Sequence, residues 1–143
     1  GTIVENRKAR HEFTFVETLE AGIVLQGSEV KSLRDSKAFF TDAYASVERG
    51  EMWLYNLNIA EYPAANRNNH VPDRKRKLLL HKKEIERLMG RIKQDGLTLV
   101  PTRLYFSKNL VKVELALARG KKLHDKRESM KKKTMQREME RFG

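Results

Sequence analysis

Hydrophobic residues recur along this chain at two different periods, which predict strands and helices in alternation. In the segment 110–118, every second position from 111 to 117 is Val or Leu, and the residues that follow them are charged or small, the pattern of a strand with one buried face. Residues 97–106 predict a second strand, joined to the first by a turn at Lys108-Asn109. Residues 13–25 are rich in β-formers, and we expect a bend or bulge where Ala21-Gly22 interrupts them.

Two more strands are predicted at residues 44–48 and 52–57, joined by a tight turn at Arg49-Gly50. Residues 58–73 contain two prolines and predict a long loop.

A helix is predicted for residues 81–93, because its apolar residues fall at i, i+3, i+4 and i+7 and so form one face. Gly96 stands where a C-terminal cap belongs. A shorter amphipathic helix is expected to start at Ser28 as N-cap, with Val30 and Leu33 buried.

These elements predict a mainly β protein, an OB-fold-type closed antiparallel β-barrel with flanking helices. The barrel domain would span residues 1–118, and residues 119–143 would form a basic C-terminal tail. Apolar residues recur too sparsely in the tail to hold a helix alone, so we expect it to be disordered by itself and helical on a partner.

The net charge of +11, from 30 Lys/Arg and 19 Asp/Glu, is concentrated in two segments. Residues 72–93 hold nine Lys/Arg against three Asp/Glu, and residues 119–143 hold ten against four. One such segment is usually a solvated surface, but two on an otherwise nearly neutral chain indicate a polyanionic partner such as nucleic acid.

The four consecutive cations of residues 74–77 follow a proline-containing loop and precede three leucines, which we interpret as the start of a helix. Such a run can neutralise several phosphates, and its alternative role is a solvated turn.

Other function classes receive little support from the sequence. There is no run of about 18 apolar residues, so we expect no membrane span. Cysteine is absent, which excludes disulfides and fits a cytoplasmic protein. The four histidines have no metal-type spacing, and no catalytic grouping or phosphate loop is evident. We therefore expect no enzyme activity and no cofactor.

Six stretches, in order along nearly the whole chain, match motifs of one family. They are Asn6-Arg-Lys-Ala-Arg-His11, Leu19-Glu-Ala-Gly22, Gly27-Ser-Glu-Val-Lys-Ser-Leu-Arg34, Arg74-Lys-Arg-Lys-Leu-Leu-Leu80, Gly96-Leu-Thr-Leu-Val-Pro101, and Ala118-Arg-Gly-Lys-Lys122 with His124-Asp-Lys-Arg127. Together they resemble the small protein B (SmpB) family.

The resemblance implies an OB-fold barrel and a monomeric RNA-binding adaptor. Such a protein binds the tRNA-like domain of transfer-messenger RNA (tmRNA) and delivers it to stalled bacterial ribosomes in trans-translation. Its body replaces the missing anticodon arm, and its tail enters the decoding site and the empty mRNA channel as a helix. The nascent peptide is then tagged for degradation.

The resemblance also implies roles for individual residues. Glu20 would accept hydrogen bonds from RNA bases or riboses rather than attract phosphate. His124 would stack on a base, and Gly120 would act as a hinge. The RNA-binding positions indicated by the resemblance and the basic run are Asn6, Arg7, Arg10, His11, Glu20, Arg74, Lys75, Arg76, Lys77 and Leu79. The ribosome-binding tail positions are Gly120, Lys121, Lys122, His124, Asp125, Lys126 and Arg127.

Two alternatives remain from the residues alone. One is a general basic OB-fold protein that binds single-stranded RNA or belongs to the ribosome; its weakness is a shortage of plausible surface aromatics for base stacking. The other is an RNA-processing enzyme, for which the sequence offers no candidate catalytic residue.

Overall fold

The computed structural model describes residues 1–121, except the side chain of Asn66. Seven strands, three α-helices and one 3₁₀ helix make up this part of the chain. In order they are β1 (Thr2–Glu5), α1 (Arg7–Glu12), β2 (Phe13–Ile23), α2 (Gly27–Arg34), β3 (Ala38–Glu48), β4 (Glu51–Ile59), η1 (Pro63–Asn68), β5 (Arg76–Leu79), α3 (Lys82–Asp95), β6 (Thr98–Ser107) and β7 (Leu110–Gly120).

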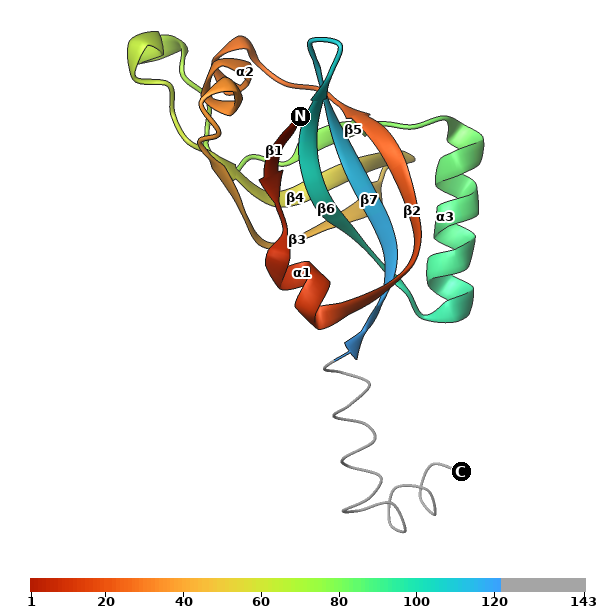
Figure 1. The fold of residues 1–143 in the computed structure, drawn as a ribbon. Coiled ribbons are helices and arrows are strands. Elements are labelled where there is room, and N and C mark those ends of the chain that lie inside the picture. Colours follow the sequence, from red (N-terminus) through yellow and green to blue (C-terminus); the bar gives the residue numbers. More distant parts are fainter. Residues whose placement is uncertain (122–143) are drawn as a thin grey trace, which may run out of the picture.

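Six of these strands close into an antiparallel barrel in the order β6-β3-β4-β5-β2-β7, with β7 pairing back onto β6 (Figure 1). The short β1 pairs with the second half of β6, while Leu99 in the first half of β6 pairs with Ala45 of β3. The predicted OB-type closed barrel with flanking helices is confirmed, with one strand more than the five of an OB fold.

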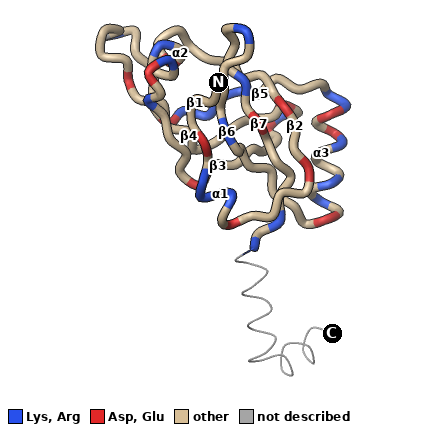
Figure 2. Tube along the Cα trace, viewed as in Figure 1, with Lys and Arg blue, Asp and Glu red and all other residues tan. Residues whose placement is uncertain are grey.

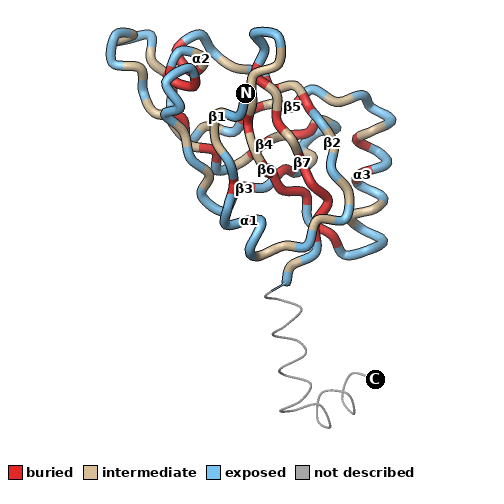
Figure 3. Tube along the Cα trace, viewed as in Figure 1, coloured by how far each residue is buried: buried red, intermediate tan, exposed pale blue. Residues whose placement is uncertain are grey.

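The barrel interior is a single apolar core to which every barrel strand contributes. Leu54, Leu78, Leu99 and Leu115 are at most 1% exposed and represent four of the six strands. Buried and exposed segments alternate along the strands (Figure 3). Most charged and polar strand residues take the outward positions, and Arg76 of β5 and Thr102 of β6 are buried exceptions.

The helices cover different parts of the barrel (Figure 1). α1 and α2 lie toward opposite ends, and α3 lies along one side. Helix α1 buries Ala9 against a small outer cluster on β6 and β7, formed with Val100, Ala116 and Ala118. Helix α3 sends Ile85 and Leu88 into the main core.

Turn chemistry explains where several elements end. Arg49-Gly50 and Lys108-Asn109 have positive φ at both positions, as two-residue hairpin turns require, and both turns were predicted. Gly96 ends α3 in the left-handed conformation with φ 63°, which glycine adopts without strain.

The structure corrects three predictions about local elements. Residues 76–79 form strand β5 rather than the start of a helix. β2 pairs regularly through Ala21-Gly22, and its register with β7 shifts between Phe15 and Glu17 instead. The N-cap of α2 is Gln26, and Ser28 instead hydrogen-bonds His70 across 2.8 Å.

Strand β7 continues two residues past the predicted boundary at 118, since Arg119 and Gly120 still pair with Thr14 and Phe13. Gly120, the predicted hinge, is thus the last residue of the strand. Most of the predicted tail positions lie outside the described residues, namely Lys122, His124, Asp125, Lys126 and Arg127.

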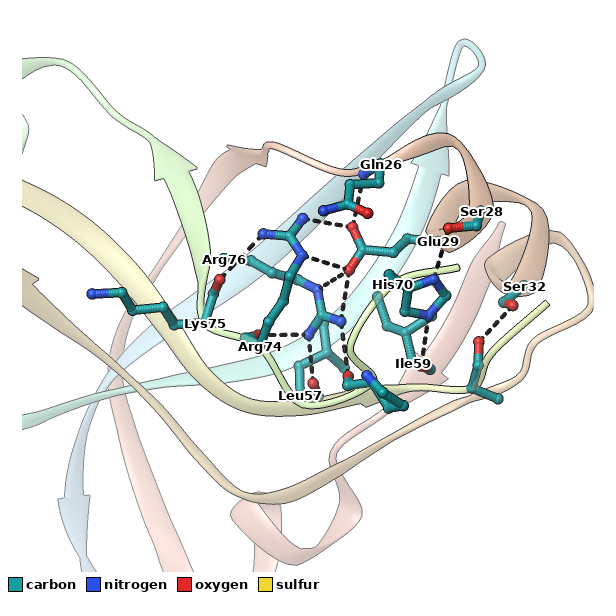
Figure 4. Close-up of polar contacts among 12 residues, drawn as sticks. Gln26, Ser28, Glu29, Ser32, Leu57, Ile59, His70, Arg74, Lys75 and Arg76 are labelled. Atoms are coloured by element: carbon teal, nitrogen blue, oxygen red, sulfur yellow. Dashed lines mark hydrogen bonds and ion pairs between the residues drawn. The ribbon is translucent and has the colours of Figure 1, made fainter. Parts of the chain in front are cut away.

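A buried ion pair joins α2 to β5. Glu29 and Arg76 are both fully buried, and the Arg76 guanidinium lies 2.7 Å from Glu29 Oε2 (Figure 4). Arg74 also donates to both oxygens of Glu29, at 2.6 and 3.0 Å. The remaining Arg76 donors bind the carbonyl oxygens of Leu57, Arg74 and Pro72. Every donor of Arg76 therefore has a partner, as burial of a charge requires.

Burial raises the pKa of Glu29, but the hydrogen bonds from Arg74 and from the Gln26 backbone N–H, together with the charge of Arg76, outweigh burial. The pKa of Glu29 therefore lies below its ordinary value of 4.5. The resulting stabilisation is complete above about pH 4.5, the value in the unfolded chain, and is lost as pH falls through the lower folded-state pKa.

Replacing Glu29 by Gln should lower the free energy of unfolding at pH 7 by about 3–5 kcal/mol, because the buried Arg76 loses its counter-charge. Urea unfolding at pH 7 and across the acid range measures this change. The variant should also lose less stability than the wild type between pH 5 and 3, a range chosen to bracket the carboxyl pKa values. The double variant Glu29→Gln/Arg76→Met should lose less free energy of unfolding than the two single variants lose in sum. Strict additivity of the two losses would contradict the coupling between Glu29 and Arg76.

Candidate nucleic-acid interface

Glu20 lies on the outer face of the barrel, directly opposite Glu114 on β7. Two opposed carboxylates repel each other, so each needs its own partner. The Tyr105 hydroxyl donates to Glu20, and the Thr102 hydroxyl donates to Glu114 Oε2 across 2.5 Å. Arg103 completes the second pair, with its Nε 3.5 Å from Glu114 Oε1.

The network continues to the edge of the sheet. The Arg103 guanidinium lies over the Tyr105 ring, 4.2 Å from its centroid, and Arg103 Nη1 donates to the Thr2 hydroxyl across 3.2 Å. Burial and the Glu20 carboxylate raise the pKa of Tyr105 to about 12. Glu20 is thus held in one orientation while its side chain remains accessible to a ligand.

Asn6 has a different place from the one predicted. Its side chain is buried, accepts from the Ala9 N–H (3.2 Å) as the N-cap of α1, and donates to the Pro101 carbonyl (2.8 Å). Between Asn6 and Glu20 lie β6 and β7, so about three strand spacings, or roughly 14 Å, separate them. Asn6 therefore fixes the start of α1 on β6 and presents little surface to RNA.

Helix α1 presents the other predicted residues of this region. Arg7, Arg10 and His11 are exposed on it, and the Arg10 guanidinium lies 5.9 Å from the centre of the Phe15 ring. The Asn6 cap fixes where this basic helix begins, so Asn6 positions the exposed basic residues of α1 without being exposed itself.

Leu79 is close to Glu20 across the β2–β5 pair. It is 53% exposed and pairs with Gly22, where a Cβ would lie only 3.2 Å from Leu79 side-chain atoms. A groove of about 1110 Å³ runs between the β3–β4 turn and the start of α3. Its lining includes Glu20, Leu79, Arg49, Lys77, Lys82 and Lys112. The groove therefore combines an apolar contact, a fixed acceptor and several cations.

The basic run is not a row of free cations. Strand alternation turns Arg76 inward, where it is fully buried, so the prediction that Arg76 contacts RNA does not fit its position. Arg74 is bound to Glu29. Lys75 pairs with Glu48, and Lys77 pairs with Glu51. Acidic residues are interspersed with basic ones over much of the molecule (Figure 2).

Aromatic side chains lie on the outer surface of β3 and β4, where the sequence predicted a shortage of them. Tyr44 and Tyr55 stack across β3 and β4 with centroids 5.0 Å apart and planes 15° apart. Trp53 follows on the same outward face of β4, with Lys75 Nζ 4.7 Å from the ring centroid. The signal was present in the alternation of Trp53 and Tyr55 with the buried Leu54.

The role of His70 in this structure is to bridge α2 and β4. It is buried, and its two ring nitrogens lie 2.8 Å from the Ser28 hydroxyl and 2.8 Å from the Ile59 carbonyl. Within residues 1–121 no three His, Cys, Asp or Glu side chains gather as a metal site would require. None of the described helices has the length and apolar character to cross a membrane.

A family model described as SmpB protein matches residues 3–143. The chain belongs to the SmpB family. The SsrA-binding protein of Geobacter sulfurreducens is 58% identical over 137 residues, which cover 96% of this chain and 90% of that protein. The SsrA-binding protein of Saccharopolyspora erythraea is 57% identical over 139 residues, covering 97% and 88%.

A solved structure described as "tmRNA-SmpB: a journey to the center of the bacterial ribosome" is similar to the chain with a TM-score of 0.70. The two are 55% identical, and the match covers 82% of this chain and 83% of that one. The resemblance to SmpB seen in the sequence motifs is thereby confirmed over nearly the whole chain.

Among the predicted body residues of this SmpB-family chain, the structure brings Glu20, Leu79 and Lys77 to one groove. Arg7, Arg10 and His11 lie together on α1. Sequence reasoning missed Tyr105, whose hydroxyl donates to Glu20, and Arg103, which lies over the Tyr105 ring and pairs with Glu114. In the sequence these residues are marked only by their outward positions in two predicted strands. Such positions do not reveal which side chains contact each other across strands.

Replacing Glu20 by Gln should lower the pKa of Tyr105 from about 12 toward, but not to, its ordinary value of 10.0, because the carboxylate is lost while burial persists. Tyrosine ring carbon shifts followed by NMR during a pH titration measure this change. Glu48→Gln is the matched control, since Glu48 accepts from Tyr55 instead and should leave Tyr105 unchanged. An unaltered Tyr105 titration in the Glu20 variant would contradict the contact.

Proposed function

We propose that this protein is an RNA-binding adaptor of trans-translation, which binds the tRNA-like domain of tmRNA and delivers it to stalled ribosomes. The observation that carries the proposal is family membership over nearly the whole chain, with curated relatives named SsrA-binding protein. The structural neighbour, described with tmRNA and the bacterial ribosome, supports the same partners.

The body would recognise RNA by shape and hydrogen bonding more than by charge. Glu20 accepts from base or ribose donors, and its orientation is set beforehand by Tyr105, on whose ring Arg103 packs. Leu79 offers an apolar contact in the same groove, and the cations on α1 hold phosphates at a separate edge. A preorganised acceptor suits a folded RNA because it avoids the cost of ordering the side chain on binding.

The finer steps are part of the same proposal. The body stands in for the missing anticodon arm, and the tail from Gly120 onward probes the decoding site and the empty mRNA channel. There Lys121, Lys122, Lys126 and Arg127 contact phosphates, and His124 stacks on a base. The protein acts as a monomer in the bacterial cytoplasm and catalyses no reaction.

The second candidate, a general single-strand binder, gains one observation in its favour. The Tyr44–Tyr55 stack and Trp53 on the outer face of β3 and β4 are rings of the kind that stack on bases without sequence preference. The relative affinities for the tRNA-like domain and for unstructured RNA separate the two functions.

At roughly 0.2 M salt, where charge alone binds weakly, the protein should bind the tRNA-like domain of tmRNA more tightly than unstructured RNA of equal length. Glu20→Ala should weaken that binding about tenfold, because an RNA donor loses its charged acceptor. Filter binding or fluorescence anisotropy gives both affinities, with Glu61→Ala as the charge-matched control. Equal affinity for the two RNAs, with Glu20→Ala binding more tightly, would refute the adaptor function.

Truncation after Lys121 should leave the affinity for the tRNA-like domain mostly intact and abolish tagging in a reconstituted translation system with stalled ribosomes. The cut lies after Lys121 rather than after 118 because β7 extends to Gly120. Loss of most tmRNA affinity in this variant would contradict the division of work between body and tail.

A further inference from the structure

Two glutamates flank the β3–β4 turn, and each is paired with one outward lysine of the basic run. Lys75 contacts Glu48, and Lys77 contacts Glu51. The four side chains are 42–45% exposed, so these ion pairs lie at the surface. Register brings Lys77 near Glu51, because the Cα partner of Lys77 is Trp53, two residues after Glu51 on the same face of β4.

The surroundings of Glu48 resemble those of a bound phosphate. Its carboxylate accepts from the Lys75 ammonium and from the Tyr55 hydroxyl, the latter across 3.0 Å. Both bonds lower the pKa of Glu48 and keep it ionised. An ammonium and a hydroxyl converging beside an aromatic ring are donors that an RNA phosphate oxygen also uses. In the free protein these donors are already occupied by an acid of the same chain.

These surface pairs differ from the buried pair of the same run. Glu29 and Arg76 are sealed from water and hold α2 on the barrel. An exposed pair changes an equilibrium by no more than about fivefold, so it can exchange its partner without loss of the fold. An incoming phosphate would therefore have to displace Glu48 or Glu51, at a small cost.

We propose that Glu48 and Glu51 are specificity-determining residues. Their carboxylates occupy the places beside Lys75 and Lys77 where RNA phosphates would otherwise bind, and so weaken the binding of any RNA that is attracted by charge alone. The inference rests on the proposed function, since it concerns how the same body selects a folded RNA. An RNA already held through Glu20 and Leu79 overcomes the small cost of displacement, whereas an unstructured RNA without those contacts gains less.

The test compares two variants of the full chain that each remove two negative charges. Glu48→Gln/Glu51→Gln frees the lysines. Asp35→Asn/Glu61→Gln is the control, because these carboxylates lie at the other end of the β3–β4 hairpin and pair with no cation within residues 1–121. Dissociation constants are measured for the tRNA-like domain of tmRNA and for unstructured RNA, from roughly 0.1 to 0.4 M salt.

Relative to the control, Glu48→Gln/Glu51→Gln should bind unstructured RNA about fivefold more tightly and the tRNA-like domain with a smaller gain. Its log–log salt slope for unstructured RNA should steepen by about 1.4, or about 0.7 for each of two new phosphate contacts. Adding Lys75→Met/Lys77→Met should cancel the gain.

Equal behaviour of the two charge variants, or an unchanged salt slope, would overturn the inference and leave the proposed function intact. Failure of the wild type itself to prefer the tRNA-like domain would instead refute the proposed function. A gain that persists after Lys75→Met/Lys77→Met would also overturn the inference, since the freed lysines would then not be its cause.

Discussion

The ion pair between Glu29 and Arg76 is the interaction on which the arrangement of this molecule depends. It places a charge pair out of water, a state that is favourable only when the remaining donors are satisfied. Those donors reach the carbonyls at the end of β4 and in the loop before β5, so one guanidinium fixes α2, β4 and β5 together. Once β5 is fixed, its alternate residues must face outward, which puts Lys77 and Leu79 on the surface.

The four cations of residues 74–77 thus serve two purposes within one short segment. Arg74 and Arg76 bind a single buried carboxylate and stabilise the fold, whereas Lys75 and Lys77 are held by carboxylates that water still reaches. The outer face around Glu20 is arranged in the same way, because Tyr105 orients an acid that remains accessible. Charge in this barrel is arranged as pairs of differing strength rather than as a uniform basic face.

The sequence predicted the strands with regular alternation, α3 and the two tight turns, because periodicity and turn chemistry are local properties. It missed β1 and α1, which are too short to show a period, and it misassigned residues 76–79, where three leucines concealed strand alternation. It identified Glu20 and Leu79 through family motifs. It could not place Tyr105 beside Glu20, since that contact depends on register between residues 85 positions apart in the chain. Nor could it distinguish the buried Arg76 from the exposed Lys77, because only packing against Glu29 decides between them.

The strand order has a consequence for how the chain acquires its fold. β1 pairs with β6, and β2 pairs with β7, so the first two strands find partners about 100 residues later. Contacts of such long separation slow folding, because the loop must close before the contact can form. The barrel therefore cannot close during synthesis until the last strand is available, and its open edges stay exposed until then. Rapid pairing of β7 after its synthesis shortens the time during which these edges are exposed. Substitutions that slow this pairing should favour aggregation of the nascent protein even where they leave the final fold unchanged.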